Sequence, residues 1–269
     1  MTTSSIFSAG DGDGYEAQMG RWSRRLAPLF VDFAGIAAAD RVLDVGCGTG
    51  SLAFTLAANP RIGGVLGVDF SPIYVAHARR QTSDPRVEFQ VGDASALALP
   101  DQGFDHALSM LVLQFIPEPV RAVREMRRVT RPGGTVAAAT WDGRGGLVMN
   151  RIVLDTAAVL DPEAGKRRAR MMARPMSLPA GLVGAWREAG LKDIVQDALT
   201  IRMEFASFAD FWTPMDGKDG PIADYLATLD ADAKARLRGL VELAYLDGEA
   251  DGPRSYAATA WVVKGRVPG

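Results

Sequence analysis

A glycine-rich turn beside an aspartate is the feature of this sequence whose residue types and spacing could do chemistry. An apolar run that contains Asp44 leads directly into Gly46-Cys47-Gly48-Thr49-Gly50, where a helical pattern begins. Glycine adopts positive φ without strain and lets a ligand approach the backbone closely. The N–H groups at the start of a helix attract anionic groups such as a carboxylate or a phosphate. The turn therefore predicts a binding site for a small ligand.

Two more aspartates, Asp69 and Asp93, end the next two apolar runs. The carboxyl ends of parallel strands meet at one edge of a sheet, so we expect the three carboxylates to gather there. Asp69 has the position from which a carboxylate can accept hydrogen bonds from both hydroxyls of a ribose. Asp44 would repel phosphates and would suit an ammonium group. The three acids together favour a nucleoside with an amino group and no phosphate, which is S-adenosylmethionine.

A dinucleotide site is the competing interpretation of the same turn. Its fingerprint is Gly-x-Gly-x-x-Gly, whereas here the third glycine comes one place early, at Gly50, and Ser51 follows it. An NAD(P)-linked oxidoreductase stays open as an alternative function. A non-catalytic protein that binds S-adenosylmethionine is a second alternative.

The elements that position these residues follow a strand–helix rhythm. Each apolar run is apolar on successive residues, as expected for strands that are covered on both faces. The runs are Arg41–Val45, Gly64–Asp69, Arg86–Val91, Phe104–Met110 and Gly134–Thr140. Helical patterns lie between them at Thr49–Ala58, Pro72–Arg80 and Pro119–Thr130. This order predicts a parallel α/β sheet with right-handed crossovers.

The flanking segments complete the expected single domain. Residues 1–14 are small and polar and are expected to be mobile. A helix with Tyr15, Met19 and Trp22 on one face follows and is expected to end near Pro28. Beyond residue 141 we expect helices over 147–189 that break at Asp161-Pro162 and at 175–179. A strand over 194–205, helices over 208–246 and a last strand over 255–264 follow.

These segments together resemble a class I S-adenosylmethionine-dependent methyltransferase of the broad family that includes ubiquinone/menaquinone C-methyltransferases. The matching segments are Val42–Gly50, Gly67–Pro72, Val91–Ala94, Phe104–Glu118 and Ala122–Gly134. The resemblance implies a Rossmann-like, seven-stranded, mostly parallel sheet with an antiparallel last strand and helices on both faces. It also divides residues 15–269 into a cofactor-binding core over 41–140 and helical insertions over the active-site rim within 147–250.

The resemblance also implies roles for individual residues. The turn glycines would line the methionine moiety, Asp69 would hold the ribose, and Phe70 would flank the adenine. Asp93 and Ala94 would contact the adenine amine and ring, and Met110 and Leu111 would border the transfer site. The full set of expected cofactor-binding residues is Tyr15, Asp44, Gly46, Cys47, Gly48, Gly50, Asp69, Phe70, Asp93, Ala94, Met110 and Leu111.

No catalytic residue and no metal site are predicted. The family often has a histidine in the segment where Gln114 stands here, so a mechanism that needs that histidine is not supported. The chain has one cysteine, Cys47, and two histidines, which excludes an intrachain disulfide and a Cys-rich zinc site. His77 and His106 are interpreted as structural residues.

The charge balance gives no sign of a nucleic-acid partner. Lysine and arginine number 30 against 32 acids, a net charge of -2, so an RNA methyltransferase is disfavoured. The arginines 121, 124, 128 and 131 are expected to form a solvated helix face. The basic cluster over 166–174 is also expected to be solvated, with contact to an acidic substrate as the alternative. The aromatic group over 205–212 is expected to pack in the core, with a pocket wall as the alternative.

The predicted function is methyl transfer from S-adenosylmethionine to a small-molecule acceptor, with S-adenosylhomocysteine as the product. The N-terminus has neither the basic start nor the apolar stretch of a signal peptide. No apolar run approaches the roughly 20 residues of a membrane-spanning helix. A cytoplasmic location is therefore expected. The acceptor and the oligomeric state have no signature in the sequence.

Overall fold

All five runs expected to be strands form the parallel part of a seven-stranded sheet with the order β3-β2-β1-β4-β5-β7-β6. The computed structural model describes residues 5–36, 38 and 41–269. The last two strands run antiparallel to each other, and β7 also runs antiparallel to β5. The bounds are β1 (Arg41–Val45), β2 (Gly64–Asp69), β3 (Val87–Val91), β4 (Phe104–Met110), β5 (Thr130–Trp141), β6 (Lys192–Phe205) and β7 (Arg254–Arg266). The expected fold class is confirmed.

The order of the strands in the sheet reverses at β1. From β1 the chain moves outward to β2 and β3, and then returns to place β4 on the other side of β1. In open α/β sheets, ligands bind at the carboxyl ends of the strands next to such a reversal. Asp44 lies in β1 opposite Gly67 of β2, two residues before Asp69 ends that strand. The register therefore brings these two acids to the same end of the sheet.

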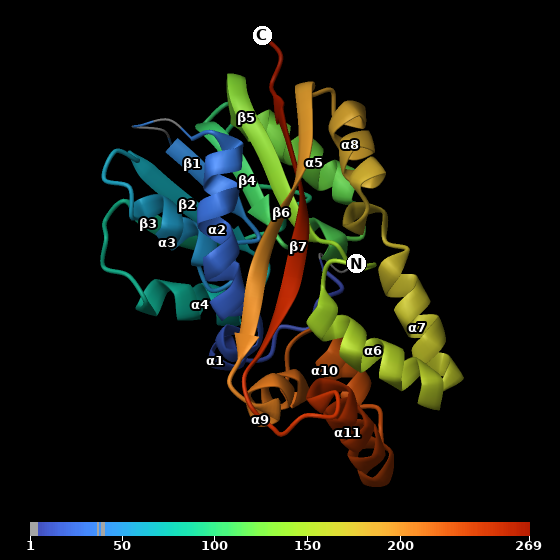
Figure 1. Cartoon of the computed structure of the whole chain (residues 1–269). Helices are drawn as coiled ribbons and strands as arrows, with labels where there is room; N and C mark the ends of the chain where they lie inside the picture. Colours follow the sequence, from blue (N-terminus) through green and yellow to red (C-terminus); the bar gives the residue numbers. More distant parts are fainter. Residues whose placement is uncertain (1–4, 37, 39–40) are drawn as a thin grey trace.

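Helices cover both faces of the sheet, and each face has its own hydrophobic core (Figure 1). The helices α2 (Arg21–Ala34), α3 (Ser51–Ala57) and α4 (Pro72–Arg80) lie on one face. The helices α5 (Pro119–Val129) and α8 (Pro179–Glu188) lie on the other face. Ser71 caps α4 by accepting a hydrogen bond from the Tyr74 N–H, as its position before Pro72 predicts.

Two helical insertions gather at the end of the sheet opposite the C-terminus (Figure 1). The first follows β5 and the second separates β6 from β7. The breaks expected at Asp161-Pro162 and near residues 175–179 are confirmed, and the Asp161 side chain caps the helix that follows it. The bounds are α6 (Val148–Leu160), α7 (Pro162–Met172), η3 (Pro175–Ser177), α9 (Phe208–Trp212), η4 (Thr213–Asp216), α10 (Gly220–Leu226) and α11 (Ala231–Leu246).

The expected end of the N-terminal helix near Pro28 is wrong. The chain begins with α1 (Gly12–Tyr15) and η1 (Glu16–Gly20), and α2 then continues through Pro28 to Ala34. Proline lacks the N–H that would close one helical hydrogen bond. Leu26 and Phe30 on either side of it are fully buried, so packing against the sheet outweighs that loss. The helix ends instead at Gly35, whose φ of 72° is the usual left-handed cap.

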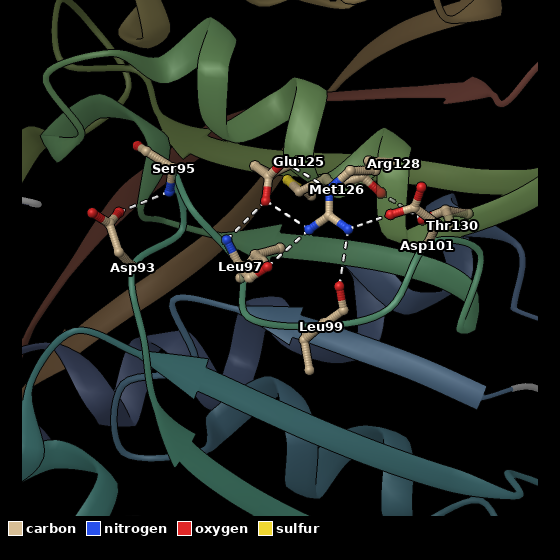
Figure 2. A network of polar contacts seen from close by, with 9 residues as sticks. All are labelled: Asp93, Ser95, Leu97, Leu99, Asp101, Glu125, Met126, Arg128 and Thr130. Atoms are coloured by element: carbon tan, nitrogen blue, oxygen red, sulfur yellow. Dashed lines mark hydrogen bonds and ion pairs between the residues drawn. The ribbon is translucent and has the colours of Figure 1, made fainter.

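Three of the four arginines of α5 pair with acids of this chain. Arg128 lies between Glu125 and Asp101 and also donates to the carbonyl oxygens of Leu97 and Leu99 (Figure 2). Arg121 pairs with Glu118, and Arg124 pairs with Glu188. Arg131, expected on the same helix face, lies in β5 because the helix ends at Val129, and it pairs with Asp105. Arg128 therefore fastens the segment that follows β3 to α5.

The aromatic group that follows β6 belongs to the core. The rings of Phe208 and Phe211 pack against Tyr245 at centroid distances of 5.6 and 5.2 Å. Phe205 packs edge-on against Trp22 of α2. The core interpretation of these residues is confirmed, because all of them are buried away from the cavity described next.

Candidate functional site

A cavity lies at the carboxyl ends of the central strands, where the sheet meets the insertions. Its walls come from the glycine turn, the ends of β2 and β4, the N-terminal segment and the helices α6, α7 and α10. Most of the residues expected to bind the cofactor line it. They are Tyr15, Asp44, Gly46, Cys47, Gly48, Asp69, Phe70, Met110 and Leu111.

Backbone geometry at the glycine turn explains its composition. Gly46, Gly48 and Gly50 have φ values of 76°, 53° and 99°, which only glycine adopts readily. A Cβ on Gly46 would lie 2.4 Å from the Val112 side chain. A Cβ on Gly48 would meet no atom within 4 Å, so the backbone at this residue faces open space. The turn thus presents bare main chain to the cavity.

Asp44 is a buried carboxyl group without a partner. It is 1% exposed, and neither side-chain oxygen has a hydrogen-bond partner of good geometry among the described residues. Burial is the main cause that raises the pKa of Asp44 to about 8, and the nearby charge of Asp69 adds to it. The Ala53 N–H lowers this pKa by a smaller amount. A buried carboxyl is costly unless it is neutral or meets a cation or a donor. Its position in the cavity wall suits a ligand that carries an ammonium group.

Asp69 connects the turn to the end of β2. Its carboxylate accepts hydrogen bonds from the N–H groups of Gly48 and Ser71, both at 2.9 Å. Burial outweighs these bonds and raises the pKa of this carboxyl. The interactions leave lone pairs of both oxygens available, since each carboxylate oxygen can accept more than one hydrogen bond.

Three of the expected cofactor residues are not among those that line the cavity. Gly50 faces the rings of Phe54 and Phe89 and accepts a hydrogen bond from the Phe54 N–H as α3 begins. Asp93 lies after the outer strand β3, and its carboxylate accepts from the Ser95 N–H at 2.8 Å (Figure 2). Ala94 packs against the core on the α5 face. The adenine contacts expected for Asp93 and Ala94 stay predictions.

The N-terminal segment covers one side of the cavity. The Ile6 N–H donates to the Phe115 carbonyl, and the ring of Phe7 lies edge-on to the ring of Phe115 at 4.9 Å. Tyr15 and Met19 line the cavity, whereas Trp22 is buried in the core, so this helical segment both covers the site and packs. Residues 1–4 lie outside the described residues, and the mobility expected for residues 1–14 stays a prediction.

A buried aspartate that the sequence analysis did not single out holds this segment. Asp219, which is 2% exposed, accepts hydrogen bonds from the N–H groups of Gly10 and Asp11 and from the Tyr74 hydroxyl. The Gly220 N–H donates to the Ser8 carbonyl. No sequence signal marks Asp219, because its partners come from the other end of the chain.

The insertions form a second, mostly apolar end of the cavity. Met171, Met172 and Arg174 belong to the basic cluster over 166–174, and the other residues of this end were missed in the sequence. The missed residues are Trp141, which ends β5, and Leu147, Asn150, Leu154 and Ile222. The signal that could have found them is their place at the end of β5 or in the insertions after β5 and β6, at the carboxyl end of the sheet.

Gln114, which the resemblance places where a histidine is expected, lines the cavity. Its side-chain NH₂ donates to the Leu111 carbonyl at 2.9 Å, and its side-chain oxygen is buried without a partner. Leu111 has a φ of 68°, a strained value for leucine that marks the bend after β4. Neither histidine of the chain is among the residues that line the cavity, in agreement with their structural interpretation.

Comparison with known proteins shows that the central part of this chain is similar to methyltransferase domains. Residues 43–138 match the family model described as a methyltransferase domain. Among curated relatives, a demethylmenaquinone methyltransferase of Renibacterium salmoninarum is 37% identical over 122 residues, which are 45% of this chain and 48% of that protein. Less than half of the length of the curated relatives is matched.

Solved structures extend the likeness to nearly the whole fold. The phosphoethanolamine N-methyltransferase 2 of Haemonchus contortus, in complex with phosphomonomethylethanolamine and S-adenosylhomocysteine, aligns with a TM-score of 0.60 at 18% identity. The alignment covers 96% of this chain and 57% of that one. The [4+2]-cyclase SpnF aligns with a TM-score of 0.57 at 24% identity, over 98% of this chain and 87% of that one. At such identities the likeness concerns the fold.

The helices were also searched for membrane spans. None of those in the described part of the chain combines the length and the apolar character that crossing a bilayer requires.

Proposed function

We propose that this chain is a class I S-adenosylmethionine-dependent methyltransferase that moves a methyl group from S-adenosylmethionine to a small-molecule acceptor. One observation carries the proposal. The bare glycine turn, the unpartnered Asp44 and the carboxylate of Asp69 face one cavity, and that cavity continues into an apolar chamber. The first part fits a cationic nucleoside, and the second leaves room for an acceptor beside it.

The residues of the turn fit the donor by their chemistry. Asp44 would pair with the ammonium group, and the N–H groups of the turn would hold the carboxylate of the methionine moiety. Asp69 would accept the ribose hydroxyls, and Phe70 would lie beside the adenine. Tyr15 and Met19 would close the site from the N-terminal side. A pyrophosphate fits less well, since two buried carboxyls line this end of the cavity.

The donor supplies an activated methyl group on a sulfonium, so the transfer is an in-line displacement in which charge is neutralised. The chain has to align the acceptor atom and exclude water. Good alignment contributes roughly 7–11 kcal/mol to lowering a barrier, whereas a general base contributes about 10²–10⁴-fold in rate. The apolar residues of the insertions and the rim formed by Met110 and Leu111 do the aligning. We therefore assign no catalytic base.

Calorimetry with S-adenosylhomocysteine tests the donor site. We expect binding to the unaltered chain and a loss of at least about a hundredfold in Asp69→Ala, because a buried charged acceptor of the ribose hydroxyls is removed. Circular dichroism should show that the variant remains folded. NADH is the control ligand and should not bind. Unchanged affinity in Asp69→Ala contradicts the ribose assignment, and preferential binding of NADH contradicts the proposed donor.

Turnover separates an enzyme from a protein that only binds the donor. A fold shared with a cyclase does not fix the reaction. Release of S-adenosylhomocysteine should depend on an added acceptor across a panel of carbon, amine, hydroxyl and carboxylate nucleophiles. Tight donor binding with no release on any acceptor would support the binding protein instead. A cytoplasmic location stays a prediction from the sequence.

A further inference from the structure

Arg174 is the one cationic residue among the described residues that line the cavity. It follows α7. We call the part of the cavity lined by Arg174, Trp141, Leu147, Leu154, Met171 and Ile222, with their neighbours from the insertions, the acceptor end. The two acids of the cavity, Asp44 and Asp69, belong instead to the donor end beside the glycine turn. The carboxyls of the cavity therefore come from the ends of β1 and β2, whereas its guanidinium comes from the segment that follows α7.

The guanidinium of Arg174 has no acidic partner among the residues that the structure describes. Its side chain is half-buried and forms no hydrogen bond or ion pair within the described part of the chain. Two basic residues of the preceding helix differ in this respect, because Arg168 pairs with Asp155 and Lys166 pairs with Glu163. Arg174 only stacks on the ring of Phe115, at 5.4 Å from the ring centroid. That contact offsets part of the cost of removing a cation from water.

Burial without a counter-charge also affects the pKa of this group. Burial alone lowers the pKa of Arg174, with no acid to oppose it. Arginine nevertheless remains charged at any physiological pH. A charged group in a largely apolar wall is costly until an anion pairs with it.

The backbone around Arg174 is held in place, so the side chain has a fixed origin. The Thr140 hydroxyl of β5 donates to the Met176 carbonyl at 2.6 Å, and the Ser177 N–H donates to the Arg174 carbonyl at 3.0 Å. Close packing adds to these bonds. A Cβ on Gly181 would lie 1.9 Å from the Pro175 carbonyl oxygen, so α8 lies directly against this segment.

We propose that Arg174 binds an oxyanion of the methyl acceptor, so that the substrate class is an apolar molecule bearing a carboxylate or a phosphate. The inference rests on the proposed function and names the acceptor that function would take. A guanidinium matches both oxyanions in a two-point geometry. The methionine and leucine side chains around it would contact the apolar body. The Gln114 side-chain oxygen, buried without a partner, would accept a hydrogen bond from a donor on the same molecule.

Matched probe molecules test this subsite. The chain is first saturated with S-adenosylhomocysteine, and calorimetry then measures binding of 2-naphthoate, 2-naphthyl phosphate and the neutral 2-naphthamide. We expect at least one of the two anions to bind tenfold or more tightly than the amide. Arg174→Met should abolish that preference, and Arg174→Lys should retain part of it, because lysine keeps the charge and loses the fork. The two anionic probes distinguish a carboxylate from a phosphate.

Arg170→Met is the matched control. Arg170 is exposed on α7, four positions before Arg174, and does not line the cavity. The Arg170→Met variant loses the same charge as Arg174→Met and should keep the full preference for the anions over 2-naphthamide. Thermal midpoints of all variants identify any that fail to fold, in which case Arg174→Lys carries the comparison.

The possible outcomes keep this inference distinct from the proposed function. If S-adenosylhomocysteine does not bind the unaltered chain, the proposed function fails. If it binds and neither anion is preferred over the amide, the proposed function stands and the oxyanion subsite is overturned. If Arg174→Met weakens S-adenosylhomocysteine itself, Arg174 belongs to the donor carboxylate and the inference is again overturned.

Discussion

The two ends of the cavity are built in different ways. At the donor end, the wall includes the bare main chain of Gly46 and Gly48, both with positive φ, and carboxyls at the ends of parallel strands. At the acceptor end, the wall is side chain, contributed by helices inserted after β5 and β6. The donor end therefore depends on backbone geometry, which tolerates almost no change. The acceptor end depends on the size and charge of individual side chains, which can change without altering the sheet.

This difference suggests how such a fold accommodates one donor and many acceptors. A ligand held by main-chain groups and strand-end acids requires the central part of the sheet to keep its register. A ligand held by insertion helices requires only that the helices dock. The following predictions test this contrast, ordered from the largest expected loss of donor affinity to the smallest.

Gly46→Ala should cause the largest loss of donor binding. The new Cβ would lie within 2.4–2.8 Å of three Val112 atoms, at a backbone φ of 76° that alanine disfavours. We expect donor affinity to fall by more than a hundredfold and stability by about 2 kcal/mol. Calorimetry and urea unfolding measure the two effects.

Gly143→Ala is its counterpart at the acceptor end. Gly143 lines the cavity, and a Cβ there meets no atom within 4 Å. Both donor affinity and stability should stay near their original values. Equal losses in the two variants would contradict the contrast between the ends.

Asp44→Asn should lower donor affinity by about ten- to a hundredfold, because a charged partner of the ammonium group is lost. In the absence of donor, the same substitution should increase the free energy of unfolding. In the unfolded chain this carboxyl ionises near about pH 4, whereas burial raises its folded pKa to about 8. The folded state then binds more protons across this interval, so its stability falls as pH rises, by up to about 1.4 kcal/mol per unit.

The Asp44→Asn variant should not show this fall in stability as pH rises. Without donor, Asp44→Asn should be more stable than the unaltered chain at pH 8, and the two should be alike near pH 4. Thermal unfolding across this range tests the sign. A variant that is less stable at pH 8 would show that Asp44 has a structural partner in the folded chain.

Arg128→Met should weaken donor binding by a few fold at most. Arg128 holds the segment that carries Asp93 and Ala94 against α5, far along the chain from the glycine turn. The loss of partly exposed pairs and two carbonyl contacts should cost about 1–2 kcal/mol at pH 7. Hydrogen bonding to Arg128 lowers the pKa of Glu125. This stabilisation is present above the unfolded pKa of about 4.3 and is lost as pH falls through the folded value.

The loss of unfolding free energy caused by Arg128→Met should therefore be smaller at pH 3 than at pH 7. Urea unfolding at the two pH values measures it. The effect of Arg128→Met on donor affinity tests the adenine contacts directly. No change at all would show that the segment after β3 does not contribute to donor binding.

Leu154→Ala should leave donor affinity within about twofold of the original while reducing stability by about 2 kcal/mol. Leu154 is 5% exposed and lines the acceptor end. Calorimetry with S-adenosylhomocysteine and urea unfolding provide the two values. A large loss of donor affinity would mean that the two ends are not separable.

Much of the fold could be predicted because its determinants are local. The bounds of β1, β2, β4 and α4 agree with the expected ranges, since apolar runs, a Ser-Pro helix start and glycine turns act over a few residues. The meeting of Asp44 and Asp69 followed from the parallel order of the strands. The acceptor end had no comparable pattern, because its residues are brought together by the docking of separate helices.

The wrong helix end at Pro28 has a physical cause. Proline in the local sequence predicts a helix end, but burial of Leu26 and Phe30 against the sheet outweighs the missing hydrogen bond. A contact distant in sequence thus decides what the local pattern leaves open. Asp93 follows a strand at the sheet edge, away from the reversal at β1, and its contact with the adenine stays a prediction.

The fastening of residues 8–11 by Asp219 and Gly220 has a consequence for how a ligand enters. Among the described residues, three hydrogen bonds join residues 8–11 to Asp219 and Gly220, whereas the strands below share a continuous ladder. Segments held by few bonds open at a smaller free-energy cost than the unfolding of the whole domain. We therefore expect this cover to open more readily than the sheet, the glycine turn and the two acids beneath it.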